Sequence, residues 1–320
     1  MTILAIAGPS GSGKSALALD LARSWVATRR PIAILCADSI TVYRGCNIGS
    51  AKPAKEEQTE FPHHLLDLKD PDEDFTAADF VRAADPVIER MQKEHGLALL
   101  VGGTGFYLRA LFQGMTEEDD LANAASESYK ELLQERLNRE GSEALYQEML
   151  ALDPELREKI HPNDHYRVIR ALQAMEATGK RWSVLNQEAR ARPPRYPDIN
   201  FFCLELPREI LAKRLRKRSQ TMLELGLLAE VKDLASRFSP ECKALQSVGY
   251  RECLEYLGLT EVIGERPKTT SELADKITQS TLRLAKRQMT WFRGEKRVEW
   301  LRGSDPAAFL PKLKERLSLS

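Results

Sequence analysis

The sequence lacks an excess of charge of either sign, and it lacks long apolar runs. Its 47 Lys and Arg residues balance 47 Asp and Glu residues, which excludes a wholly basic nucleic-acid binder but allows local basic patches. The longest apolar runs, 32–37 and 97–101, fall far short of the roughly 20 residues that span a bilayer. Because no basic region precedes the apolar segment 3–7, this segment is not typical of a signal peptide.

Cysteine is also scarce. The five cysteines, at positions 36, 46, 203, 242 and 253, include no C-x-x-C pair, and their number is odd. This spacing fits neither a disulfide framework nor a zinc site. We therefore expect reduced, mostly packing thiols in a cytoplasmic protein without a membrane segment.

The remaining composition is that of a globular protein, with 42% hydrophobic and 29% charged residues, and 320 residues favour two domains. Strand-like and helix-like segments alternate, which predicts an α/β fold with a parallel sheet flanked by helices. The expected strands are 3–7, 32–37, 97–101, 201–206 and 298–301, and the expected helices are 15–25, 76–92, 208–237 and 271–293. Residues 116–197 read as an inserted helical domain within a core formed by 1–115 and 198–320. Within the insertion, Asp164 is predicted to cap a helix whose apolar face is formed by Val168, Ile169, Leu172 and Met175.

The strongest local motif is a G-x-x-x-x-G-K-S segment between a predicted strand and a predicted helix. It consists of Gly8, Pro9, Ser10, Gly11, Ser12, Gly13, Lys14 and Ser15. Backbone N–H groups and a helix N-terminus can surround a phosphate there, Lys14 adds a charge, and Ser15 offers a hydroxyl to Mg²⁺. The motif predicts a P-loop that binds a diphosphate or triphosphate, a nucleotide such as ATP included. It does not indicate which bond breaks.

Polar residues follow the two other predicted N-terminal strands. Asp38 and Ser39 come directly after 32–37, and Gly102 to Gly105, with Thr104 among them, follow 97–101. Ligands of open parallel sheets bind beyond the carboxyl ends of the strands, so these residues are expected to face the phosphate loop. Three interpretations of Asp38 stay open: a Mg²⁺ ligand, a proton acceptor, or a cap of the following turn.

Two segments are strongly basic. Residues 208–218 and 283–297 each contain six basic residues and one acidic residue. A solvated helix face is the usual explanation of such a run. Two of them in a neutral chain favour an anion-binding surface, which suits RNA because phosphate contacts dominate nucleic-acid affinity.

Taken in order, these segments resemble the tRNA dimethylallyltransferase (tRNA isopentenyltransferase) family. The resemblance continues through further blocks along nearly the whole chain. They are 38–53, 62–67, 78–80, 101–107, 153–154, 161–172, 214–250 and 285–291. No zinc-finger extension follows residue 301, so the bacterial type is expected.

The resemblance implies that a dimethylallyl group moves from dimethylallyl diphosphate to N6 of the adenosine 3′ to the anticodon of tRNA, with release of diphosphate. It implies catalysis by Asp38, Thr104 and Arg218, with Arg218 joining residues 8–15 at the diphosphate and Mg²⁺ held by Ser15. The implied contacts with the tRNA anticodon stem-loop are Asp38, Ser39, Ile40, Thr41, Thr104, Lys130, Tyr166, Arg167, Val168, Ile169, Arg170, Lys286 and Arg287. A monomer is expected.

Three other functions compete with this one: a P-loop kinase acting on a small metabolite, an adenylate isopentenyltransferase acting on free nucleotide, and a non-catalytic RNA-binding NTPase. Glycines in place of a Walker-B acid after 97–101 disfavour the kinase. The long insertion disfavours the free-nucleotide enzyme.

The chain also departs from the family pattern in two places. Thr41 stands where many members have glutamine. The acidic run 117–120 replaces the usual entry to the insertion, with Lys130 as the stand-in for an arginine.

Overall fold

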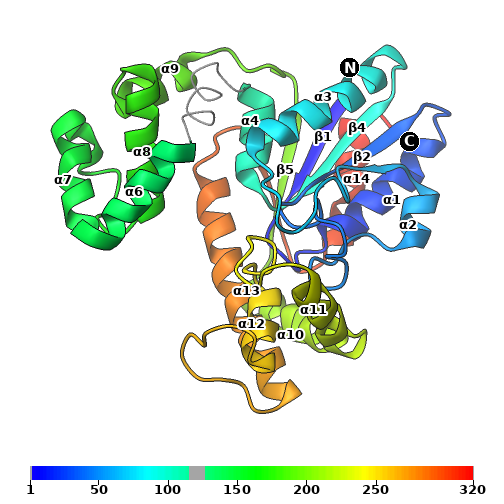
Figure 1. Ribbon diagram of the computed structural model, residues 1–320. Coiled ribbons are helices and arrows are strands. Elements are labelled where there is room, and N and C mark those ends of the chain that lie inside the picture. Colours follow the sequence, from blue (N-terminus) through cyan, green and yellow to red (C-terminus); the bar gives the residue numbers. More distant parts are fainter. Residues whose placement is uncertain (1, 115–126, 320) are drawn as a thin grey trace. The chain divides into compact units, whose positions relative to one another are not determined.

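The computed structural model describes residues 2–114 and 127–319 and contains a six-stranded parallel sheet (Figure 1). The strand order is β3-β2-β4-β1-β5-β6. The strands are β1 (Thr2–Ala7), β2 (Ile32–Ala37), β3 (His63–His64), β4 (Leu97–Gly102), β5 (Asn200–Glu205) and β6 (Glu299–Arg302). The predicted α/β fold with a parallel sheet is confirmed. The short β3 was not among the expected strands.

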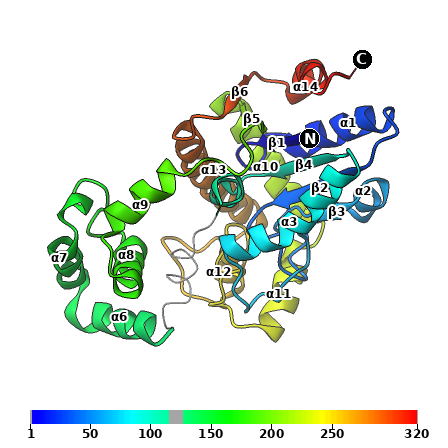
Figure 2. The same ribbon diagram turned by 90° about the horizontal axis from the view of Figure 1, so that it is seen from above.

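Alternating side chains of the strands form a core on one face of the sheet. Leu4 and Ile6 of β1 and Leu97 and Leu99 of β4 belong to this cluster. They meet helix α1 (Lys14–Val26), which contributes three residues spaced four apart: Leu17, Leu21 and Trp25. Helix α3 (Ala77–Lys93) packs against β2 and β4, and Figure 2 shows the strands between α1 and α3. Both strand faces are therefore covered, which explains why these strands are apolar throughout.

The C-terminal part departs from the prediction in one place. A single helix was expected over 208–237, but the structure has α10 (Arg208–Glu224) and α11 (Leu227–Arg237). Gly226 separates them in a left-handed conformation with φ of +99°, which glycine adopts without steric cost. The expected helix over 271–293 is confirmed as α13 (Thr270–Arg293), which packs along α10.

The other elements are helices of varied length. They are α2 (Lys55–Glu60), α4 (Gly105–Gln113), α6 (Glu127–Glu140), α7 (Ser142–Leu152), the 3₁₀ helix η1 (Pro154–Leu156), α8 (His165–Thr178), α9 (Trp182–Ala191), α12 (Tyr250–Leu257), η2 (Pro306–Phe309) and α14 (Leu310–Arg316). No helix of the described residues is long and apolar enough to cross a membrane.

The chain divides into two compact units: residues up to Leu108 together with those from Asp198 onward, and Arg109–Pro197. The second unit has its own hydrophobic core, built by α6, α7 and α8. Asp164 caps α8 by accepting a hydrogen bond from the Arg167 N–H, as predicted. Buried Asp153 joins η1 to α9 by accepting bonds from the backbone N–H and the hydroxyl of Ser183, at 2.7 and 3.0 Å. The predicted boundary at 115–116 and the acidic run 117–120 lie outside the described residues.

Candidate active site

Three strand ends meet in register at one edge of the sheet. Gly102, the last residue of β4, pairs with Ala37 at the end of β2 and with Ala7 at the end of β1. The residues that follow these positions are Gly8, Asp38 and Gly103. Their predicted convergence is therefore fixed by the pairing of the strands, since carboxyl ends of parallel strands share one edge.

The phosphate loop leads directly from β1 into α1. Gly11 and Gly13 have φ values of +79° and +88°, and Gly13 is the left-handed N-cap of α1. A Cβ atom on Gly11 would lie 2.6 Å from a terminal methyl group of Leu215, and the positive φ is the feature that requires glycine there. The first N–H groups of α1 have no partners within the helix and point outward from its N-terminus. The loop is thus built to receive an anion.

Two cations and a carboxylate share this edge. Burial is the main cause that lowers the pKa of Lys14 to about 8. The nearby charge of Arg218 lowers this pKa further, whereas the charge of Asp38 raises it. Burial also lowers the pKa of Arg218, while Asp38 raises it. The Lys14 ammonium donates to the Pro9 carbonyl at 3.4 Å, a long hydrogen bond. The structure therefore brings Lys14, Asp38 and Arg218 together, as the resemblance implies, in a form that favours a bound polyanion.

Asp38 serves as a turn cap with one of its oxygens. Its Oδ1 accepts hydrogen bonds from the N–H groups of Ile40 and Thr41 at 2.9 and 3.4 Å. No described residue donates a hydrogen bond to Oδ2. The cap interpretation and a chemical role are therefore compatible, because the cap leaves one carboxylate oxygen for another partner.

Thr104 connects the ends of β2 and β4. Its hydroxyl accepts from the Ser39 N–H at 3.1 Å, and its own N–H donates to the Ala37 carbonyl at 3.1 Å. The approach of the two strands is close, since a Cβ atom on Gly102 would lie only 1.9 Å from the Ala37 oxygen. Thr104 and Asp38 are thus held beside each other by main-chain contacts.

Thr41 departs from the expectation of a direct contact through its side chain. Its side chain is only 5% exposed, and its hydroxyl has no hydrogen-bond partner among the described residues. Ser39 and Ile40 are partly exposed beside Asp38. The turn capped by Asp38 points the side chain of Thr41 into the protein.

Gln288 of α13 was not recognised as a site residue from the sequence. Its Oε1 accepts from the Ser10 N–H at 3.1 Å, and its Nε2 donates to the Gly103 carbonyl at 3.0 Å. One amide therefore joins the phosphate loop to the turn that carries Thr104. The sequence shows only a glutamine on a basic helix, and nothing local indicates these distant partners.

The predicted tRNA contacts of the second unit differ in exposure. Tyr166 is 79% exposed, and the exposed Arg167 pairs with Asp164 at 3.3 Å. In contrast, Val168 and Ile169 are 2% and 9% exposed, in the core of this unit. Their side chains pack the helix, so an RNA contact through them is not supported. The two other predicted contacts are an exposed Lys130 and a half-buried Arg170.

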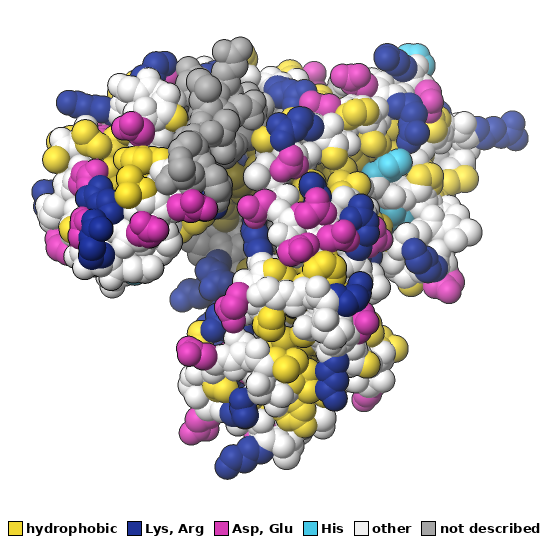
Figure 3. Space-filling view, in the orientation of Figure 1, with side chains coloured by type: hydrophobic (Ala, Val, Ile, Leu, Met, Phe, Trp, Pro, Cys, Tyr) yellow, Lys and Arg dark blue, Asp and Glu magenta, His cyan; other side chains and the backbone are white. Residues whose placement is uncertain are grey.

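The basic segments 208–218 and 283–297 are partly neutralised within the protein. Arg216 pairs with Asp275 at 3.1 Å, and Arg293 pairs with Glu205 at 2.7 Å. Lys286 and Arg287 are exposed on α13, without an ion-pair partner in the described part of the chain. On the face drawn in Figure 3, basic and acidic side chains are interspersed. The expected anion surface is therefore smaller than the charge count indicates.

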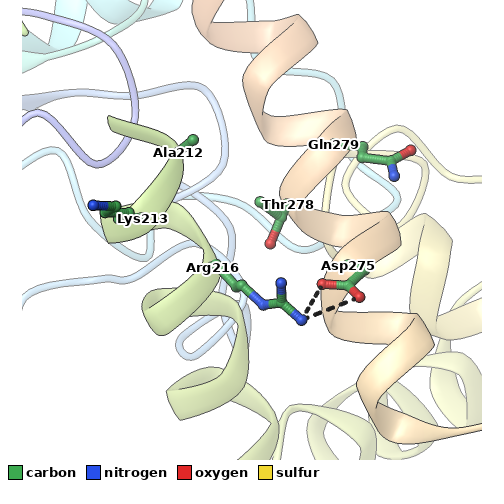
Figure 4. A pocket seen from close by; sticks show the side chains of 6 residues that line it. All are labelled: Ala212, Lys213, Arg216, Asp275, Thr278 and Gln279. Atoms are coloured by element: carbon green, nitrogen blue, oxygen red, sulfur yellow. Dashed lines mark hydrogen bonds and ion pairs between the residues drawn. The ribbon is translucent and has the colours of Figure 1, made fainter. Parts of the chain in front are cut away.

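A cavity of about 440 Å³ lies between α10 and α13. Its lining is formed by Ala212, Lys213, Arg216, Asp275, Thr278 and Gln279. Figure 4 shows Arg216 reaching toward Asp275 across it. None of the predicted site residues lines this cavity.

The parallel sheet, with a Gly8–Ser15 loop leading from its first strand into α1, defines a P-loop NTPase-like fold. Residues 41–295 match the model of the IPP transferase family, described as "IPP transferase". The chain belongs to this family.

Relatives and solved structures agree with this assignment. A tRNA dimethylallyltransferase 1 of Trichlorobacter lovleyi is 43% identical over 300 residues, which is 93% of each chain. The full-length tRNA isopentenylpyrophosphate transferase of Bacillus halodurans superposes with a TM-score of 0.67 at 32% identity, covering 99% of this chain and 95% of that one. A eukaryotic dimethylallyltransferase solved acting on tRNA gives a TM-score of 0.80 at 25% identity, with 99% and 78% covered.

Proposed function

We propose that this protein transfers the dimethylallyl group of dimethylallyl diphosphate to N6 of the adenosine 3′ to the anticodon in tRNA. The observation that carries the proposal is the grouping of Asp38, Lys14 and Arg218 at one sheet edge, in a member of the IPP transferase family. Relatives over almost the whole chain bear the name tRNA dimethylallyltransferase. We infer a cytoplasmic location from the proposed tRNA substrate.

The reaction breaks the bond between the allylic carbon and the diphosphate oxygen and forms a bond from that carbon to N6. Negative charge grows on the leaving diphosphate, which the loop N–H groups, Lys14 and Arg218 stabilise. Oδ2 of Asp38, to which no described residue donates a hydrogen bond, accepts the proton that N6 loses. Thr104, bonded to the Ser39 N–H, holds the turn beside Asp38 in place. The adenosine has to leave its stack to reach this edge, at a cost of about a few kcal/mol that contacts elsewhere on the RNA offset.

Mg²⁺ fits this arrangement through Ser15. The ion usually keeps several waters and binds through few protein groups together with substrate phosphates. Ser15 lies in the first turn of α1, and its exposed side chain follows Lys14 directly. Its hydroxyl would hold Mg²⁺ together with diphosphate oxygens, and the bound ion would neutralise part of the diphosphate charge.

The close packing at the end of β4 favours prenyl transfer over a kinase reaction. A Walker-type acid would follow β4, the strand next to the phosphate-loop strand β1, whereas Asp38 follows β2, one strand further away. Gly102 has no space for any side chain, because a Cβ atom would overlap the Ala37 carbonyl. The exposed Tyr166 and Arg167 in the second unit favour an RNA acceptor over a free nucleotide, since a free nucleotide requires no such second unit.

The test uses the full chain with Mg²⁺, labelled dimethylallyl diphosphate, and either unmodified tRNA or AMP. We expect label in tRNA, mapped to the adenosine 3′ to the anticodon, and none in AMP. Label in AMP alone would identify a nucleotide prenyltransferase. ATP hydrolysis without prenyl transfer would identify a phosphate-loop NTPase, and either of these two results would overturn the proposal.

A further inference from the structure

The carboxylate of Glu230 binds the far end of the loop that begins at Asp38. Glu230 Oε2 accepts from the N–H groups of Asn47 and Ile48 at 3.1 and 2.8 Å. Its Oε1 accepts from the N–H groups of Ile48 and Gly49, both at 3.1 Å. Three consecutive N–H groups thus surround one carboxylate, an arrangement that ordinarily binds a free anion.

Tyr250 completes this contact from a third segment. Its hydroxyl donates to Glu230 Oε1 at 2.7 Å, and its ring is fully buried. A Cβ atom on Gly49 would lie 2.4 Å from that ring, so the loop rests directly on it. Burial raises the pKa of Tyr250, which keeps the hydroxyl protonated as a donor.

Main-chain contacts transmit this restraint back to Asp38. The Lys52 N–H donates to the Asn47 carbonyl at 3.0 Å, and the Lys52 ammonium donates to the Tyr43 carbonyl at 2.8 Å. The Tyr43 N–H in turn donates to the Ile40 carbonyl at 3.0 Å, within the turn that Asp38 caps. The segment from Asp38 to Lys52 is therefore one connected network.

The break at Gly226 makes this contact geometrically available. Arg218 lies on α10 and reaches the diphosphate side of the site, whereas Glu230 lies in the first turn of α11. Two consecutive helices thus hold both sides of the reaction centre. Leu234 of α11 adds an apolar contact to the same loop, where a Cβ atom on Gly45 would approach it to 3.0 Å.

We propose that Glu230 is a positioning residue that holds the loop 38–53 in the conformation presenting Asp38 to the acceptor adenosine. This inference rests on the proposed prenyl transfer to tRNA. Glu230 acts through the loop and does not touch substrate. Without its charge the loop samples other conformations, so the acceptor side of the reaction suffers while the diphosphate side does not.

The test compares Glu230→Gln with the wild type and with Asp233→Asn, a matched control on the exposed face of α11. We expect Glu230→Gln to raise KM for tRNA about tenfold, because an amide retains only one acceptor oxygen and no charge. KM for dimethylallyl diphosphate should change less than twofold. Amide hydrogen exchange at Asn47, Ile48 and Gly49 should accelerate, while exchange in β1 and β4 stays unchanged.

Tyr250→Phe removes only one bond to Glu230 and should give a smaller change in the same parameters, which keeps the test informative if Glu230→Gln folds poorly. A merely structural role predicts a lower active fraction, with reduced kcat, unchanged KM values and unchanged exchange at 47–49. That result would overturn the inference. A different result would refute the proposed function itself: Glu230→Gln shows faster exchange at 47–49, but the wild type transfers no prenyl group to tRNA. The positioning role would then fall with the proposed function.

Discussion

Lys14 should make the affinity for dimethylallyl diphosphate depend on pH in a range where few other groups titrate. Its pKa in the free protein is lowered from 10.5 to about 8, first by burial. A bound diphosphate favours the protonated lysine. Affinity is therefore full below the lowered pKa and decreases as the pH rises through about 8.

The size of the effect follows from the fraction of charged lysine. About nine-tenths of the Lys14 side chains are protonated at pH 7 and about one-tenth at pH 9, so Kd should rise about tenfold between these values. The diphosphate itself is already about nine-tenths ionised at pH 7, because the second pKa of a phosphate ester is about 6, so it adds little to the change. The neighbouring Cys203 stays protonated, because burial raises the pKa of its thiol to about 12.

Isothermal titration calorimetry at pH 7, 8 and 9 measures this dependence. Titrations at pH 8 in buffers of different ionisation enthalpy measure the protons taken up on binding. We expect uptake of about half a proton, by Lys14. Lys14→Met should bind more weakly and with an affinity that hardly changes between pH 7 and 9. An unchanged wild-type Kd from pH 7 to 9, or the same slope in Lys14→Met, would refute the role given to Lys14.

Three further predictions test other parts of the structure. Arg167→Ala should weaken tRNA binding and reduce the slope of log Kd against log salt by about one, and an unchanged slope would mean that Arg167 does not contact phosphate. Gln288→Met should lower kcat about tenfold, because it removes both bonds between the phosphate loop and the Thr104 turn. Tm should fall as well, since the Ser10 N–H and the Gly103 carbonyl lose their partner, and normal kinetics would show that the bridge is dispensable. Gly102→Ala should destabilise the protein by about 3 kcal/mol, measured as a lower Tm. Gly294→Ala should cost far less, because a Cβ atom there would lie 3.3 Å from its nearest neighbour, and equal effects would contradict the packing at β4.

Local patterns predicted the central fold because each signal is short-range. The apolar runs 32–37 and 97–101 and the glycine-rich loop 8–15 each combine a strand signal with a turn signal in a few residues. The register that aligns Ala7, Ala37 and Gly102 then follows from the geometry of a parallel sheet. Asp38 and Thr104 could therefore be placed at one edge from sequence alone.

The contacts missing from the prediction join residues far apart in the chain. Gln288 is 278 positions from Ser10, and Glu230 is 183 positions from Asn47. A polar residue on a helix face carries no local sign of such a partner. The burial of Val168 agrees with its place on the predicted apolar face of α8, and it disagrees only with the tRNA contact that the family resemblance implies.

The role of Asp38 is the central claim, and single-turnover prenyl transfer by Asp38→Asn tests it most directly. Asparagine keeps the cap on the N–H groups of Ile40 and Thr41 but cannot accept the proton from N6. The measurement follows label transfer from dimethylallyl diphosphate to bound tRNA, with tRNA affinity determined in parallel. We predict a loss of at least about a hundredfold in the transfer rate with nearly unchanged tRNA binding. Transfer at the wild-type rate, or loss of binding with normal chemistry, would contradict the account.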